Sequence, residues 1–100
     1  MSEESADDES KSYNNYMSWY LYIAESSKGK FYVGITTEPK RRIEDHNKGN
    51  GSRMAKIEGP FRLIYTSLPM ANQSEARKRE IQIKGWTRAK KQKLIKGELE

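Results

Sequence analysis

The stretch WYLYIAESSKGKFYVGI, from Trp19 to Ile35, decides the fold of this chain. It contains two short runs of aromatic and aliphatic residues, 19–23 and 31–35, of the kind that form β-strands. The turn-forming residues Ser-Ser-Lys-Gly lie between the runs, so the sequence predicts an antiparallel hairpin. Alternation along each strand then gives the hairpin one apolar face and one face that carries the phenols of Tyr22 and Tyr32.

A helix is expected to follow this hairpin. Thr37 or Glu38 can cap it, and Pro39 fits its first turn. At about 100° per residue, Arg42 and His46 fall on the inward arc of this helix. Polar side chains on an inward arc need partners, and a site is one place to find them. Two phenols on a hairpin, followed by an arginine and a histidine on a helix, suggest a site that attacks phosphodiesters.

The remainder of the chain reads as one more strand and two more helices. Residues 61–68 form the predicted third strand, which a proline ends. Asn72 is the expected cap of the next helix, on which Ala76, Glu80 and Ile83 recur at helical spacing, so Glu80 is expected to face the core. A lysine-rich helix over 88–96 comes last. The predicted fold is therefore α+β, a three-stranded antiparallel sheet flanked by helices in the order β-β-α-β-α-α.

Charge is distributed unevenly along the chain. Residues 1–18 carry five acids against one lysine, a net charge of −4, and few apolar residues, so we expect a disordered acidic tail. One domain is expected over 19–96, and 97–100 form the C-terminal end. Since the whole chain carries +5, the residues after the tail carry +9, which favours a polyanionic partner such as nucleic acid. A solvated basic surface is the alternative.

The composition excludes several classes of protein. Cysteine is absent and there is one histidine, which excludes a disulfide scaffold and a thiolate zinc site. No apolar run approaches the ~20 residues of a membrane span. The N-terminus lacks the pattern of a signal peptide. We therefore expect a cytoplasmic protein without a membrane partner.

The quoted segments resemble the GIY-YIG nuclease superfamily, and more narrowly its small stand-alone bacterial members. The two name-giving triplets correspond to Tyr-Leu-Tyr at 20–22 and Tyr-Val-Gly at 32–34, and residues 76–84 resemble the second helix of that group. The resemblance covers about residues 19–96 and implies the same order of strands and helices. The first triplet departs from the family pattern, with Tyr20 and Leu21 in place of Gly and Ile. An asparagine that some members carry after the glutamate has no convincing equivalent here.

The resemblance implies cleavage of phosphodiester bonds with one divalent cation, Mg²⁺ or Mn²⁺, and places the functional positions at Tyr22, Tyr32, Arg42, His46 and Glu80. Glu80 is the expected metal ligand, because Mg²⁺ needs only one or two carboxylates besides waters and substrate oxygens. The planar guanidinium of Arg42 suits a phosphoryl group. Either Tyr22 or His46 can be the proton acceptor, and Tyr32 can orient the water or bind the phosphate, so the roles of the two phenols stay open.

Each of these side chains also has a plain structural explanation. Glu80 can pair with Lys84 one turn along its helix. Arg42 can form a surface ion pair with Glu38 or Glu44. Tyrosines in strands commonly pack on a half-buried sheet face.

A set of basic residues outside this site is expected to contact nucleic-acid phosphates, which positions a substrate without reading its sequence. They are Lys28, Lys30, Arg53, Lys56, Lys90, Lys91 and Lys93. A solubilising face is the alternative for each of them.

The expected function is a metal-dependent endonuclease that acts on DNA with little sequence specificity, in repair or processing, with RNA as a further candidate substrate. The rivals are a non-catalytic nucleic-acid-binding module and a nuclease subunit that needs a protein partner. The sequence leaves the oligomeric state open.

Overall fold

The computed structural model describes residues 17–48 and 57–99. Within them the predicted order of strands and helices is confirmed: β1 (Tyr20–Ser26), β2 (Phe31–Thr36), α1 (Pro39–Asn47), β3 (Phe61–Thr66), α3 (Gln73–Lys84) and α4 (Arg88–Ile95). Most of the predicted acidic tail and two predicted phosphate contacts, Arg53 and Lys56, lie outside the described residues.

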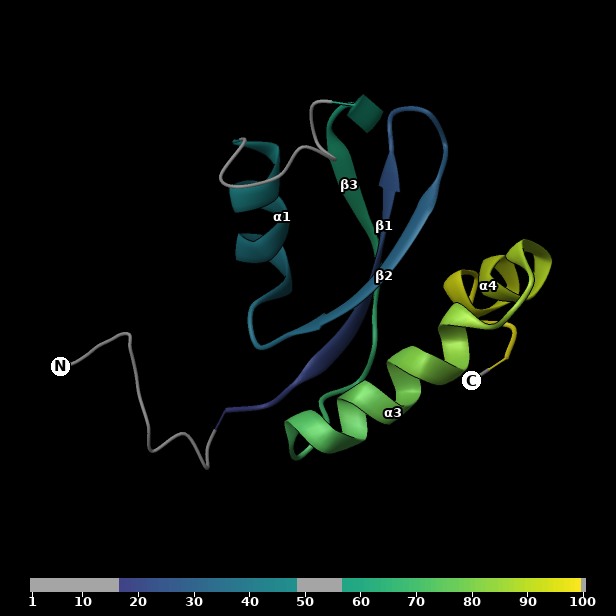
Figure 1. Cartoon of the computed structure of the whole chain (residues 1–100). Coiled ribbons are helices and arrows are strands. Elements are labelled where there is room, and N and C mark those ends of the chain that lie inside the picture. Colours follow the sequence, from purple (N-terminus) through teal and green to yellow (C-terminus); the bar gives the residue numbers. More distant parts are fainter. Residues whose placement is uncertain (1–16, 49–56, 100) are drawn as a thin grey trace, which may run out of the picture.

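The three strands form one antiparallel sheet in the order β2-β1-β3, with β1 in the middle (Figure 1). β1 continues to Ser26, beyond the apolar run at 19–23, because its backbone pairs with both neighbours along that length. β3 ends at Thr66, short of the predicted residue 68. The β1–β2 register places Tyr22 opposite Gly34. The predicted hairpin is therefore confirmed, and it brings the phenolic face of β1 against the one glycine of β2.

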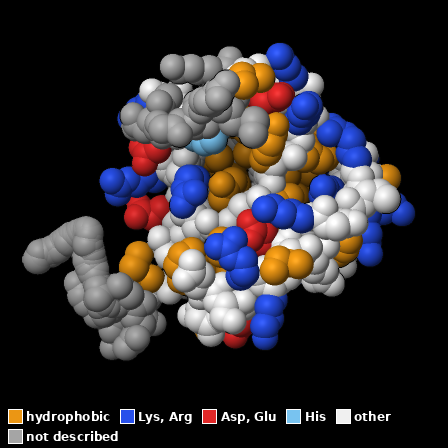
Figure 2. Space-filling model, viewed as in Figure 1, with side chains coloured by type: hydrophobic (Ala, Val, Ile, Leu, Met, Phe, Trp, Pro, Cys, Tyr) orange, Lys and Arg blue, Asp and Glu red, His pale blue; other side chains and the backbone are white. Residues whose placement is uncertain are grey.

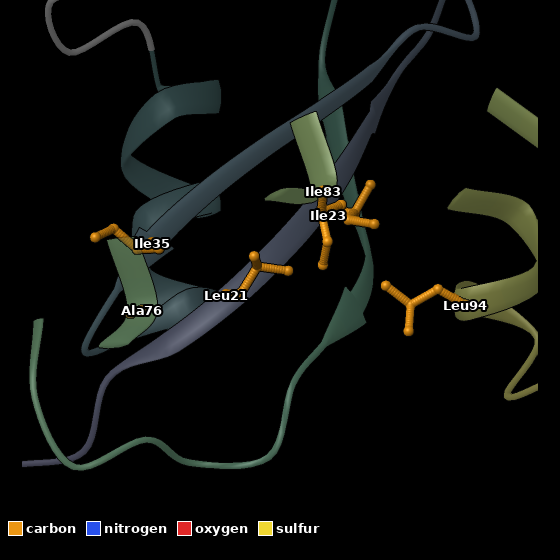
Figure 3. Close-up of a cluster of buried hydrophobic side chains, with 6 residues drawn as sticks. All are labelled: Leu21, Ile23, Ile35, Ala76, Ile83 and Leu94. Atoms are coloured by element: carbon orange, nitrogen blue, oxygen red, sulfur yellow. The ribbon is translucent and has the colours of Figure 1, made fainter. Parts of the chain in front are cut away.

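The apolar face of the sheet packs against α3 and α4. Buried side chains from two strands and both helices form one core, shown in Figure 3: Leu21, Ile23, Ile35, Ala76, Ile83 and Leu94. Burial of this apolar area is the main favourable contribution to folding. The alternation in the hairpin predicted this face correctly.

The opposite face of the sheet, which carries the phenols, packs against α1 (Figure 1). A smaller cluster of buried residues, Ala24, Ile43 and Phe61, joins the two layers, and Tyr22 and Tyr32 pack against it. Pro39 is the first residue of α1, as predicted, and the N-cap is Glu38, whose side chain makes no capping hydrogen bond. The sheet is thus enclosed between two helical layers, one of which covers the predicted site.

Side-chain caps begin the other two helices. The Oδ1 atom of Asn72 accepts a hydrogen bond from the backbone N–H of Glu75 at 2.9 Å, which confirms the predicted cap. The Oγ1 atom of Thr87 does the same for Lys90 at 3.2 Å. These caps set where α3 and α4 begin, and hence which side chains of α3 face the sheet.

None of the helices in residues 17–48 and 57–99 is both long and apolar enough to cross a bilayer.

Two isoleucines of α3 provide a matched test of this packing. Ile83 is 0% exposed and Ile81 is 65% exposed. We expect Ile83→Ala to lower the free energy of unfolding by about 2–5 kcal/mol, because it leaves a cavity in the core. Ile81→Ala should change it by no more than about 0.5 kcal/mol. Urea unfolding followed by circular dichroism measures both, and equal losses would contradict the assigned face of α3.

Candidate active site

Tyr22 packs directly over the backbone of Gly34, its partner across the hairpin. A Cβ atom placed on residue 34 would lie 2.5 Å from the phenolic oxygen of Tyr22 and 2.6 Å from its Cζ atom. The ring therefore takes the space that any side chain at this position would fill. Because Gly34 belongs to β2, the phenol extends from the central strand towards an outer strand of the sheet.

The charged side chains that shift the pKa of Tyr22 lie near its phenol. Burial, the largest effect, raises the pKa of this phenol above its usual value. The charge of Arg42, and a hydrogen bond with its side chain, lower the pKa, whereas the charge of Glu80 raises it. Side chains from β1, α1 and α3 thus interact at one place. Since the net direction is upward, the phenol is protonated at neutral pH.

Arg42 does not form the surface ion pair that the sequence offers as its alternative role. Its neighbour Arg41 makes the contacts along the outer side of α1, 3.9 Å from Glu38 and 3.8 Å from Asp45. The two adjacent arginines therefore point to different surroundings, and Arg42 is the one that reaches Tyr22.

Tyr32 and His46 share a cavity with Tyr22. The cavity has a volume of about 220 Å³, and apolar side chains form the rest of its wall: Ala24, Val33, Ile43 and Phe61. A larger cavity of about 650 Å³ lies between α1 and β3 and is lined by none of the five predicted site residues. The smaller cavity is the better candidate, because it combines two phenols and an imidazole in one hollow.

Phe61 is a site residue that the sequence reasoning missed. Its ring makes an edge contact with Tyr32, with centroids 4.9 Å apart, and another with His46, at 4.7 Å. One aromatic ring from β3 therefore contacts two predicted functional side chains and helps to orient them. Its place at the start of a strand gave no sign of this role.

Asn47, next to His46, attaches α1 to β3. Its Oδ1 atom accepts a hydrogen bond from the backbone N–H of Phe61 and its Nδ2 atom donates one to the Phe61 carbonyl, both at 2.7 Å. The amide thus pairs with the outer edge of β3 as another strand would. Since the same bonds hold Phe61, they fix the ring on which His46 rests.

Glu80 lies on the inward stripe of α3, as its spacing predicts, and is 5% exposed. Its Oε1 atom is 2.5 Å from Arg77 Nη1, and its Oε2 atom is 3.3 Å from Lys84 Nζ. The sequence offered an ion pair with Lys84 as the plain structural explanation of Glu80. The structure contains this ion pair, and the Glu80 side chain is also buried. Two cations compensate the charge of a buried carboxylate.

The donor set around Glu80 fits a Mg²⁺ or Mn²⁺ ion that is held jointly by protein and substrate. No group of three or more acidic, histidine or cysteine side chains comes together within the described part of the chain, so a cage made of protein ligands is absent there. Mg²⁺ does not require one, since it commonly binds one or two carboxylates, waters and substrate phosphates. Any cation at Glu80 has to compete with Arg77 and Lys84.

Basic side chains are spread over the face seen in Figure 2, with hydrophobic side chains near its centre. Five of the seven predicted phosphate contacts are among the described residues. Lys28 lies exposed in the hairpin turn, Lys90 places its Nζ atom 4.4 Å from the centroid of the Trp86 ring, and Lys93 is exposed in the last turn of α4. Lys30 and Lys91 line a common pocket.

Comparisons with known proteins agree on one family. The profile of the GIY-YIG catalytic domain matches residues 18–93. A UPF0213 protein of Staphylococcus aureus strain Mu50 is 40% identical over 79 residues, covering 79% of this chain and 95% of that protein.

Two solved structures are also similar. A solution NMR structure of a UPF0213 protein from Bacillus halodurans is 38% identical, with a TM-score of 0.50, and covers 80% of this chain and 84% of that one. A solution NMR structure of a protein from E. faecalis is 40% identical, with a TM-score of 0.55, and covers 86% and 92%.

The electrostatic contacts of Tyr22 predict opposite effects of two substitutions. Arg42→Gln should raise the pKa of Tyr22 further, because it removes a charge and a hydrogen bond that lower it. Glu80→Gln should lower it, because it removes a negative charge. A pH titration of isotope-labelled tyrosine by NMR, with signals assigned by Tyr→Phe variants, measures both directions. If Glu80→Gln leaves the Tyr22 titration unchanged, the carboxylate is not beside the phenol.

The attachment of α1 through Asn47 predicts a change at His46. Asn47→Ala should lower the free energy of unfolding by about 1–2 kcal/mol, because two hydrogen bonds are lost. It should also shift the imidazole signals in the NMR spectrum, since the Phe61 ring is no longer held. His46 is the single histidine of the sequence, so these signals are unambiguous in untagged protein. Asn72→Ala, a cap on α3, is the control, and it should destabilise the protein without moving the imidazole signals.

Proposed function

Because this chain belongs to the GIY-YIG family, we propose that it is a metal-dependent endonuclease that hydrolyses phosphodiester bonds in DNA, with RNA as a further candidate substrate. The proposal includes little sequence specificity, since the described residues form one catalytic-type domain with a basic surface. It also includes a setting in DNA repair or processing and a cytoplasmic location.

One observation carries the proposal: the phenol of Tyr22 on β1 interacts both with a guanidinium on α1 and with a carboxylate on α3. Tyr32 and His46 line the cavity that continues from this phenol. Hydrolysis of a phosphodiester needs an oriented water, a proton acceptor and positive charge at the phosphoryl oxygens. Side chains suited to each of these tasks lie within this one site.

In the proposed mechanism, the Arg42 guanidinium binds non-bridging oxygens of the phosphate and neutralises charge that develops on them. Tyr22 acts as a neutral phenol, because burial raises its pKa, and its hydroxyl orients the attacking water. His46 accepts the proton of that water, since imidazole is the side chain suited to proton transfer near neutral pH. Tyr32, which also lines the cavity, contacts the phosphate.

Glu80 is the proposed ligand of a divalent cation, Mg²⁺ or Mn²⁺. When bound, the cation supplies further positive charge to the phosphoryl group and the leaving oxygen. Arg77 and Lys84 compensate the charge of Glu80, and they also hold both of its oxygens.

A second candidate function has support from the same contacts. Ion pairs to both oxygens of Glu80 are the arrangement expected of a carboxylate with a structural task. On that basis the chain would be a nucleic-acid-binding module without cleavage activity, or a subunit that becomes active with a protein partner.

Cleavage of a labelled DNA substrate with Mg²⁺ or Mn²⁺ tests the proposal. Arg42→Gln and Glu80→Gln should each reduce the rate by about 100-fold or more, because each removes charge from the reaction centre. Arg41→Gln and Glu75→Gln are the matched controls on the same helices, since Arg42 and Glu80, and not these two residues, affect the Tyr22 phenol. The controls should retain most of the activity, and all four variants should keep their circular dichroism spectra.

Two outcomes would decide against the nuclease proposal. If the wild-type protein and the Arg42 and Glu80 variants show the same trace cleavage, the activity comes from a contaminant. If the wild-type protein binds DNA but does not cleave it with either cation, the binding-module candidate is favoured.

A further inference from the structure

A second pocket lies directly beside the candidate active site. It has a volume of about 260 Å³ and is formed by the start of β2 and by α4, through Lys30, Phe31, Tyr32, Arg88 and Lys91. Tyr32 also lines the cavity that contains Tyr22 and His46. The two hollows therefore share one phenol, and a ligand that extends past Tyr32 can occupy both.

The charged side chains of this second pocket suit an anionic ligand. Three of its five lining residues are cationic. The acids nearby are already engaged: Glu25 is 2.8 Å from Arg62 and 3.9 Å from Arg88, and Glu58 is 3.4 Å from Lys30. Lys91 makes no ion pair with any acid in the described part of the chain, so the pocket retains a net positive charge.

Arg88 is held in place before any ligand arrives. Its Cζ atom lies 3.8 Å from the centroid of the Phe31 ring, and its Nη2 atom lies 3.9 Å from Glu25. Stacking on the ring fixes the plane of the guanidinium while leaving N–H groups available at its rim. A side chain held in this way loses less conformational freedom on binding, which favours the bound state.

We propose that this pocket binds a backbone phosphate of the nucleic-acid strand, on the side of Tyr32 away from the phosphate that is cleaved. The inference rests on the proposed function and adds to it the direction in which the strand leaves the site, over the start of β2 towards α4. The ligand class is a phosphodiester, bound through its non-bridging oxygens. Such a contact positions the strand without reading its bases.

Two lysines provide a matched test. Lys91 lines the pocket, whereas Lys78, which is exposed on α3 and outside the set of expected phosphate contacts, does not. Binding of fluorescently labelled single-stranded DNA to the full chain is measured by anisotropy in EDTA, between about 50 and about 200 mM salt. We expect Lys91→Gln to reduce the slope of log K against log salt by about 0.7, the loss of one phosphate contact on a single strand. Lys78→Gln should leave the slope close to that of the wild-type protein.

A charge reversal and a parallel cleavage assay complete the experiment. Lys91→Glu should weaken binding more than Lys91→Gln, with an unchanged circular dichroism spectrum. Equal slopes for the Lys91 and Lys78 variants, together with normal cleavage by the wild-type protein, would overturn the subsite and leave the proposed function standing. A loss confined to the Lys91 variants, without cleavage by the wild-type protein, would support the subsite and contradict the nuclease proposal. Absence of DNA binding by the wild-type protein would overturn both.

Discussion

The close packing of the Tyr22 ring over Gly34 is the constraint on which the rest of the site depends. A phenol that fills the place of a side chain at residue 34 can cross an outer strand and reach charged groups from both helical layers. Arg42 approaches from α1 and Glu80 from α3, two helices that pack on opposite faces of the sheet. Without the space at Gly34, the sheet would keep these two side chains apart.

The electrostatics of the resting protein follow from burial. Glu80 is almost fully enclosed, and a lone buried carboxylate is costly, so two cations of its own helix accompany it. The same enclosure raises the pKa of Tyr22 more strongly than Arg42 lowers it. The resting site therefore places a carboxyl group that is paired with Arg77 and Lys84 beside a neutral phenol. A substrate phosphate or a divalent cation would change this balance by competing for the same charges.

Aromatic packing positions Tyr32 and His46, the other two predicted site residues. Phe61 makes edge contacts with both Tyr32 and His46, and Asn47 attaches the backbone of Phe61 to the end of α1. Beyond Tyr32, the ring of Phe31 performs a similar task for Arg88. Rings that are themselves packed against the sheet thus position the polar groups on both sides of Tyr32, which limits how far those groups can move.

Local periodicity in the sequence was sufficient to predict the hairpin, the two faces of its strands, the cap at Asn72 and the inward orientation of Glu80. These features depend on residues within a few positions of one another, so the chain encodes them directly. Only the tertiary structure decided that Phe61 and Asn47, 14 positions apart, would hold His46, and that burial would prevail over Arg42 at the Tyr22 phenol. Those outcomes depend on which elements pack together and how much water they exclude, which no local pattern specifies.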